Sequence, residues 1–403
     1  MQAVDKMPPA PWMRAPQTRA LLAALTAEGA IVRFVGGCVR DSLAGRPVRD
    51  IDVATAAAPR ENLRLLAAAG IKAVPTGIDH GTVTAVVDGR PFEVTTLRVD
   101  VETFGRHARV AFTDDWRADA HRRDFTINAL YADPDGRIYD PTGGLADLRR
   151  GRIRFVGRAE QRIEEDRLRI LRFFRFHAWY GRGAANRAAL AACGRAAAGI
   201  ERLSGERVRQ ELMQLLAAPE PRPALRLMAR HDVLRHLLPA GADLRALSRL
   251  IRTEAQAGTA AEPLLRLAAL VRGWAAADAR RLAERLRLAN AERERLLVLL
   301  RETAPAAGGG EPALRRSIYR LGVELIVDLA LLAGRPRLAA AARALPRPEF
   351  PLRGRDGLAL GLKPGPALGR HLAAVETWWA AQDFRPDAEA CRRRLAALAG
   401  RDA

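Results

Sequence analysis

The chain has 403 residues, of which 49% are hydrophobic and 28% charged, a balance typical of soluble globular proteins rather than disordered or fibrous ones. Its 66 Lys and Arg residues against 46 Asp and Glu residues leave a formal net charge of +20. Three widely separated cysteines exclude a disulfide framework and a Cys-x-x-Cys zinc site. Because no apolar run reaches the roughly 18 residues of a membrane span, we expect a soluble, cytoplasmic protein with no membrane partner.

Almost all of the positive charge is arginine, since Lys6, Lys72 and Lys363 are the only lysines. Guanidinium groups bind phosphate in a bidentate manner, so the excess favours a polyanionic partner such as nucleic acid. The alternative is a composition in which arginine fills every ordinary surface site. Charge alone does not separate the two interpretations.

The first third of the chain combines short β-branched runs with short helical segments. Residues 1–17 form a Pro-rich leader, and an Ala/Leu run predicts a helix over Thr18–Glu28. The predicted strands are Ile31–Val35, Ile51–Ala54, Thr82–Val87, Phe92–Thr96 and Ile138–Tyr139, with helices near Val39–Leu43 and Arg60–Ala69. This pattern indicates an α/β or α+β domain.

After Gly157 the chain is rich in Leu, Ala and Arg with helical spacing of the apolar residues. The predicted helices cover 159–180, 185–198, 204–217, 222–237 and much of 243–304. Residues 304–313 and 346–357 are predicted loops because they concentrate glycine and proline. The remainder of the chain is therefore expected to be all-α.

The first chemical motif is a Gly-Gly turn between a predicted strand and a short helix. Gly36 and Gly37 let backbone N–H groups approach an anion, and Arg40 adds a full positive charge nearby. Without further motifs, such a turn is most often only a turn.

A pair of carboxylates follows the turn. Asp50 and Asp52 lie at the start of the predicted strand Ile51–Ala54, where residues i and i+2 point to the same side. Side-by-side carboxylates repel unless a cation lies between them, and Mg²⁺ binds through one or two carboxylates plus substrate phosphates. The pair predicts a Mg²⁺ site for nucleotide chemistry.

Two further segments are open to a functional or a structural interpretation. Glu93, in a β-rich apolar run, is either a third catalytic carboxylate or the structural partner of an arginine. Arg123 belongs to the polar segment RRDFTINAL (122–130), which either orders a triphosphate or forms a salt-bridged hinge.

The predicted helix Glu160–Tyr180 places charged residues three positions apart. Asp166, Arg169, Arg172 and Arg175 would occupy neighbouring positions along it. An acceptor-only Asp beside a donor-only Arg matches the Watson–Crick edges of cytosine and adenine and mismatches guanine and uracil. The alternative is a solvated face with intrahelical ion pairs.

Taken together, these motifs resemble the class II family of tRNA CCA nucleotidyltransferases and bacterial poly(A) polymerases, within the DNA polymerase β-like nucleotidyltransferase superfamily. The matching segments are GGCVRDSLAGRPVRDIDVAT (36–55), RRDFTINAL (122–130), YDPTGGLADL (139–148), EEDRLRILRFFRF (164–176) and SGERVRQELMQLL (204–216). The resemblance implies a multidomain α+β fold, with a mixed-sheet head and an all-α neck, body and tail. The expected divisions are a leader at 1–17, a catalytic head at 18–157, a base-recognition neck at 158–217, a body at 218–303 and a tRNA-binding tail at 304–403.

The resemblance also implies roles for individual residues. Asp50 and Asp52 match metal-binding carboxylates, and Glu93 is carried over as a further catalytic residue. The nucleotide-binding positions are Gly36, Gly37, Arg40, Arg123, Asp166, Arg169, Arg172 and Arg175. Val99–Trp116 is expected to contain a flexible loop, in which Phe104 precedes Gly105-Arg106 where the family commonly has an acidic residue.

The implied activity is Mg²⁺-dependent addition of CCA to the 3′ end of tRNA from CTP and ATP, with no protein partner required. Alternatives are a poly(A) polymerase or an A-only or CC-only enzyme with the same head. A non-catalytic RNA-binding protein is a further alternative. The dipeptide His231-Asp232 suggests a phosphohydrolase, but only His236 lies nearby as another ligand.

Overall fold

A computed structural model describes residues 1–104 and 107–400. The chain divides into two compact units, Met1–Gly241 and Ala242–Ala403, which are described separately. None of the helices within these described ranges is long and apolar enough to cross a membrane.

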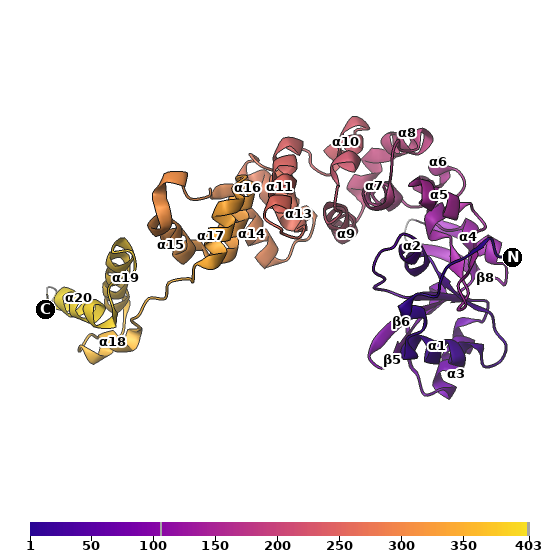
Figure 1. The fold of residues 1–403 in the computed structure, drawn as a ribbon, viewed down its shortest axis with the longest axis horizontal. Coiled ribbons are helices and arrows are strands. Elements are labelled where there is room, and N and C mark those ends of the chain that lie inside the picture. The colour runs from indigo at the N-terminus through magenta and orange to yellow at the C-terminus, as the bar shows by residue number, and fades with distance from the viewer. Residues whose placement is uncertain (105–106, 401–403) are drawn as a thin grey trace. The chain divides into compact units, whose positions relative to one another are not determined.

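The first unit contains an eight-stranded sheet in the order β1-β10-β9-β2-β3-β6-β5-β4 (Figure 1). Only β3 and β6 pair in parallel among the strands described, so the sheet is mixed, as the resemblance implied. Its strands are β1 (Asp5–Lys6), β2 (Val32–Val35), β3 (Asp52–Thr55), β4 (Lys72–Gly77), β5 (Thr82–Val87), β6 (Arg90–Thr96), β9 (Tyr131–Ala132) and β10 (Arg137–Tyr139). A separate hairpin consists of β7 (Arg98–Phe104) and β8 (His107–Phe112).

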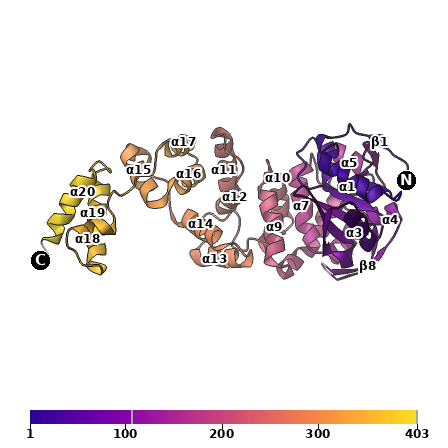
Figure 2. The same cartoon turned by 90° about the horizontal axis from the view of Figure 1, so that it is seen from below.

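Helices α1 and α3 pack against each other and against β5, while α9 and α10 both pack against α7 (Figure 2). The helices of this unit are α1 (Pro16–Thr26), α2 (Gly37–Leu43), α3 (Pro59–Ala68), α4 (Trp116–His121), α5 (Gly144–Arg150), α6 (Ala159–Glu165), α7 (Leu168–Tyr180), α8 (Arg187–Ala196), α9 (Gly205–Leu216) and α10 (Arg222–Arg230).

The sequence analysis missed strands β1, β4, β7, β8 and β9. β4 is an exposed strand at the edge of the sheet and contains Pro75, so it lacks the alternation of buried and exposed residues that identifies a strand. Much of the segment expected to be a flexible loop forms the β7–β8 hairpin, whose residues 105–106 lie outside the described ranges.

An aromatic cluster attaches α7 to the segment that follows the sheet. The Phe155 ring stacks on Phe173 of α7 at 5.7 Å between centroids, and Phe125 contacts Phe155 at 4.7 Å. Phe176 meets Phe125 edge-on at 5.2 Å. Because Phe125 and Phe173 are fully buried, this contact fixes the position of the polar residues on the same helix.

The second unit is helical wherever the structure assigns regular secondary structure. Its helices are α11 (Leu244–Gln256), α12 (Pro263–Leu270), α13 (Ala276–Arg285), α14 (Asn290–Arg301), α15 (Gly310–Leu321), α16 (Val323–Leu332), α17 (Pro336–Ala344), α18 (Gly354–Ala359), α19 (Pro366–Ala381) and α20 (Ala388–Ala399). Two predicted loops were therefore drawn too long, since α15 begins inside 304–313 and α18 begins inside 346–357. Both errors arose because each helix begins with a glycine, a residue that favours a loop in a prediction from sequence.

We predict that Phe173→Ala lowers the free energy of unfolding of the first unit by about 3–5 kcal/mol, because it leaves a cavity between α7 and the Phe125–Phe155 pair. Urea unfolding followed by far-UV circular dichroism measures the change. The matched control is Phe112→Ala, whose ring is 46% exposed and whose loss should cost about 1 kcal/mol or less. Equal effects of the two variants would contradict the assigned role of the cluster.

Candidate active site

A cavity of about 940 Å³ in the first unit brings together every site residue predicted from the sequence. The predicted residues in its wall are Gly36, Gly37, Arg40, Asp50, Asp52, Glu93, Arg123, Asp166, Arg169, Arg172 and Arg175. Residues separated by up to about 140 positions therefore face one space.

The Gly-Gly turn connects β2 to α2. Gly36 has φ +69°, a backbone conformation that L side chains rarely adopt. Its amide donates to the Leu130 carbonyl oxygen at 3.1 Å, so this N–H belongs to the sheet rather than to a ligand. The donors that the turn offers to an anion are the amides of the first turn of α2, beginning at Gly37, which have no intrahelical acceptor.

Three carboxylates line the cavity near the N-terminal end of β3, a central strand of the sheet. Asp52 begins β3 and lies opposite Glu93 of β6 in the parallel register, so both side chains are on one face. β3 begins at Asp52 rather than at Ile51, which leaves Asp50 outside the strand. The Ile51 carbonyl oxygen still accepts a hydrogen bond from the Glu93 amide at 3.2 Å, and both aspartates line the same cavity. That Asp50 and Asp52 point to the same side of the strand stays a prediction.

The mutual repulsion of these carboxylates is reflected in the pKa of Asp52. Burial of the carboxyl, together with the charges of Glu93 and Asp50, raises its pKa to about 6 against the opposing effect of Arg123 and Arg40. An ionised Asp52 is therefore costly in the absence of a cation.

The two arginines nearest the glycine turn are fixed by hydrogen bonds. Arg40 donates to Asn128 Oδ1 at 2.5 Å and to Asp41 at 3.0 Å. Arg123 pairs with Asp119 at 3.0 Å. Each guanidinium is thus held in one orientation before any ligand binds.

The predicted continuous helix Glu160–Tyr180 is in fact two helices. α6 ends at Glu165, Asp166 has an extended backbone with φ −153° and ψ 110°, and α7 begins at Leu168. Because Asp166 is not in a helix, the three-residue helical spacing does not relate it to Arg169. Asp166 instead accepts a hydrogen bond from the Leu168 amide at 3.1 Å, which satisfies a free N–H at the start of α7.

Neighbouring side chains hold the two candidate base-reading residues. Arg207 of α9 pairs with Asp166 at 2.6 Å, and Arg169 pairs with Glu165. Both Asp166 and Arg169 are mostly buried yet line the cavity. An acceptor and a donor therefore remain next to each other at this wall, by a different local geometry from the predicted one.

The last two predicted arginines form a network with buried acids. Arg172 pairs with Asp124 at 2.6 Å, and Arg175 pairs with Glu211 at 2.5 Å. Burial raises the pKa of Asp124, but the charge of Arg172 and the hydrogen bonds from Asn128 and Arg172 together outweigh burial and lower it to about 2. Much of the positive charge on this wall is therefore neutralised within the protein.

The sequence analysis did not assign site roles to several further residues in the wall. They are Arg98, Asp124, Asn128, Glu165, Arg207 and Glu211. Asp124, Asn128, Glu165, Arg207 and Glu211 belong to the quoted motifs, so their positions inside those motifs were the available signal. Arg98 lies outside them, and burial together with the charge of Arg122 lowers its pKa to about 10.

Comparison with known proteins identifies two family models along the first unit. The Poly A polymerase head domain matches residues 32–154, and the probable RNA and SrmB-binding site of polymerase A matches residues 187–244. The mitochondrial CCA tRNA nucleotidyltransferase 1 of Mus musculus is 34% identical over 370 residues, covering 88% of this chain and 84% of the relative. The CCA-adding enzyme of Limosilactobacillus fermentum is 31% identical over 380 residues, covering 89% and 90%.

Solved structures give the same result for the fold. The Bacillus stearothermophilus CCA-adding enzyme in complex with CTP has a TM-score of 0.72 at 27% identity, covering 93% of this chain and 94% of that one. The Thermotoga maritima CCA-adding enzyme complexed with tRNA has a TM-score of 0.67 at 22% identity, covering 99% and 100%. The second of these supports the fold alone.

We predict that Asp52→Asn stabilises the metal-free protein at neutral pH. The folded-state pKa of about 6 lies above the ordinary value of 3.8, so the cost of ionising Asp52 is nearly absent below pH 4 and complete above pH 6. The shift corresponds to about 3 kcal/mol at pH 7.5 and less than about 1 kcal/mol at pH 4.

Urea unfolding in the presence of a chelator at both pH values measures this difference. The control is Asp135→Asn, whose side chain is in an exposed ion pair with Arg137 and should change stability by about 1 kcal/mol or less. If Asp52→Asn is no more stable than the parent protein at pH 7.5, the pKa of Asp52 is not raised by burial and neighbouring carboxylates as described.

Proposed function

This chain belongs to the family of CCA-adding tRNA nucleotidyltransferases, and from that premise we propose how its cavity adds CCA to the 3′ end of tRNA from CTP and ATP. The observation that carries the proposal is the single cavity in which three carboxylates, the glycine turn and the base-reading pair meet. The whole-length similarity to enzymes named for CCA addition favours this activity over a poly(A) polymerase. A cytoplasmic location stays a prediction from the sequence.

The carboxylates near the start of β3 are suitable ligands for a divalent cation. Within the described ranges, no three His, Cys, Asp or Glu side chains are close enough to form a complete metal site. Mg²⁺ needs no such site, because it commonly binds one or two carboxylates and completes its shell with substrate phosphates and water. Asp50 and Asp52 would hold the ion, which when bound activates the RNA 3′-hydroxyl and neutralises charge on the phosphates.

The protein's own residues position the two reactants. The 3′-oxygen of the RNA attacks the α-phosphorus of CTP or ATP, the bond to the β-phosphate breaks, and pyrophosphate leaves. The amides that follow Gly36 and the guanidiniums of Arg40 and Arg123 face the cavity and would bind the triphosphate. Their hydrogen bonds to Asn128 and Asp119 fix these donors beforehand, which lowers the entropic cost of ordering the nucleotide.

Base selection is assigned to Asp166 and Arg169. Cytosine and adenine both present an amino donor next to a ring-nitrogen acceptor, which match a carboxylate and a guanidinium. Guanine and uracil present the reverse pattern, and each mismatched polar contact would cost on the order of 1–3 kcal/mol. Arg207 and Glu165 hold the two groups, so one protein surface accepts both correct bases.

The direct test is an extension assay on tRNA that ends immediately before CCA. With CTP and ATP together we expect addition of C, C and A in order, with CTP alone two C residues, and with ATP alone no extension. A long A homopolymer, or addition of A to the truncated end, would overturn CCA addition in favour of the alternative activities.

In the same assay, we expect Asp50→Ala and Asp52→Ala to reduce incorporation by at least about 10²–10³-fold, because each removes a charge at the reacting phosphate. RNA affinity should change less than about threefold, since phosphate contacts elsewhere dominate it. The matched control is Asp135→Ala, an exposed aspartate outside the cavity, which should retain activity. Unchanged turnover in both variants would eliminate this carboxylate site.

We further predict that Asp166→Ala and Arg169→Ala raise incorporation of UTP and GTP relative to CTP. Each removes one of two polar mismatches, so discrimination should fall by about 5–150-fold, from about 1–3 kcal/mol per contact. Ratios of kcat/KM for the four nucleotides measure this. If both variants lose activity and remain equally selective, these residues do not read the base.

A further inference from the structure

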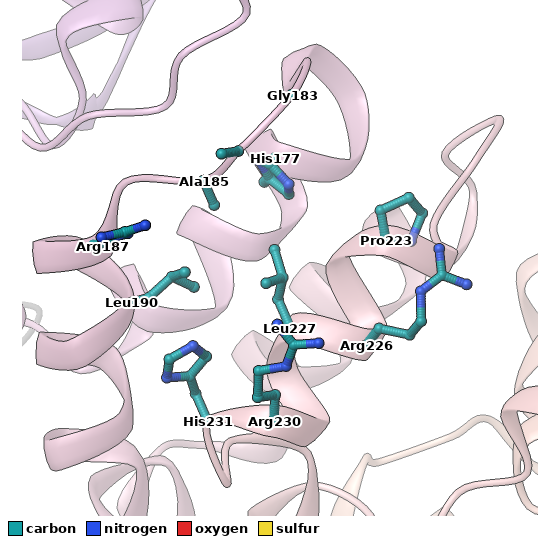
Figure 3. A pocket seen from close by; sticks show the side chains of 11 residues that line it. His177, Gly183, Ala185, Arg187, Leu190, Pro223, Arg226, Leu227, Arg230 and His231 are labelled. Carbon is teal, nitrogen blue, oxygen red and sulfur yellow. The ribbon is translucent and has the colours of Figure 1, made fainter.

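A second cavity, of about 510 Å³, lies beside α7, α8 and α10 (Figure 3). Its wall contains Arg187 from α8 and Arg226 and Arg230 from α10. No Asp or Glu side chain lines it. The cavity is therefore strongly positive and contains no residue of the predicted catalytic machinery.

Two arginines of this cavity, Arg187 and Arg230, differ from their neighbours in lacking counter-charges. Within the described ranges, neither Arg187 nor Arg230 forms an ion pair or a side-chain hydrogen bond, whereas Arg195, also on α8, pairs with Glu160 at 2.8 Å. Arg226 contributes to lowering the pKa of Glu220, whose hydrogen-bond partner is Arg222. Cations that face one space without acids repel one another, and a bound anion relieves that repulsion.

The rest of the wall fits a ligand that carries a sugar or base as well as a charge. Leu190 and Leu227 project into the cavity in Figure 3, and His177 and His231 lie on either side of them. Burial lowers the pKa of His177, so its ring supplies a neutral hydrogen-bonding edge. Free inorganic phosphate would leave these apolar and imidazole surfaces unused.

This cavity faces away from the nucleotide site. Arg175 and His177 are two positions apart on α7, which places them about 160° apart around the helix axis. Arg175 lines the large cavity and His177 lines the second one. A nucleotide bound at the second cavity is therefore separated from the reaction centre by the helix itself.

We propose that this second cavity binds a phosphodiester-linked nucleotide of the RNA substrate, with Arg187 and Arg230 contacting phosphate and Leu190 and Leu227 contacting the nucleoside. The proposal rests on the proposed function for the identity of the RNA as tRNA. The three arginines fall within the segment 187–244 that matches the probable RNA and SrmB-binding site of polymerase A, and the proposal assigns RNA binding within that segment to this one cavity. The cavity acts as an anchor for RNA and takes no part in the chemical step.

The test compares the double variant R187E/R230E with the control R19E/R60E. The control carries the same charge change on two exposed arginines of α1 and α3, which line neither cavity. Affinity for truncated tRNA is measured without nucleotides by filter binding from 50 to 400 mM KCl. We expect the cavity variant to bind at least about tenfold more weakly than the control and to reduce the slope of log K against log salt by about 2.

Kinetic measurements distinguish RNA binding at the second cavity from nucleotide binding at the active site. At saturating tRNA, kcat and the KM for CTP should match those of the control variant. Equal tRNA affinity and salt dependence in both double variants would overturn the proposal. Weakened CTP binding with unchanged tRNA affinity would also overturn it, because the cavity would then hold a free nucleotide.

Different results would disprove the proposed function and the RNA-binding role of the second cavity. If the parent protein binds tRNA with the expected salt dependence but adds no CCA, the proposed function is wrong and the anchor is retained. The milder variant R187Q/R230Q, with an intermediate loss of affinity expected, excludes repulsion by the introduced glutamates as the cause.

Discussion

The repulsion among the carboxylates at the start of β3, in the middle of the sheet, is the constraint on which the rest of the site depends. Asp52 and Glu93 are opposite each other because β3 and β6 pair in parallel. Asp50 lies two residues before Asp52, just outside β3. A fold selected for stability alone has no reason to place three like charges around one space, with Asp52 half-buried and Asp50 and Glu93 exposed. The sheet topology creates a position at which ionised carboxylates are unfavourable unless a cation and phosphates occupy the cavity.

Neutralisation of the arginines is the counterpart of this crowding. The count of 66 Lys and Arg residues overstates the positive charge available to a ligand, because Arg172, Arg175 and Arg123 are paired with acids inside the first unit. These ion pairs neutralise the charge of each guanidinium and fix its orientation. A guanidinium that is already oriented loses less entropy when a nucleotide arrives, whereas one without a partner contributes more charge. The nucleotide cavity and the second cavity differ in this respect.

The sequence predicted the membership of the site better than its local geometry. Chemistry-bearing residues such as Asp52 and Arg169 are recognisable by type and spacing, and the structure places them on one cavity. The break between α6 and α7 was missed because Leu- and Arg-rich sequence continues through it without a Gly or Pro. The extended backbone at Asp166 accompanies a hydrogen bond to Leu168 and an ion pair to Arg207, 41 positions away, and only the second contact is tertiary. Periodicity within one segment contains no information about such a partner.

The position of α7 links these features. Its buried face carries the Phe173 and Phe176 contacts to Phe125, one flank carries Arg172 and Arg175 toward the nucleotide cavity, and another carries His177 toward the second cavity. A single rigid helix thereby fixes both ligand positions to the same aromatic anchor. Because packed aromatic side chains resist small displacements more than solvated ion pairs do, the geometry between the two cavities is set by the core rather than by the charges that line them.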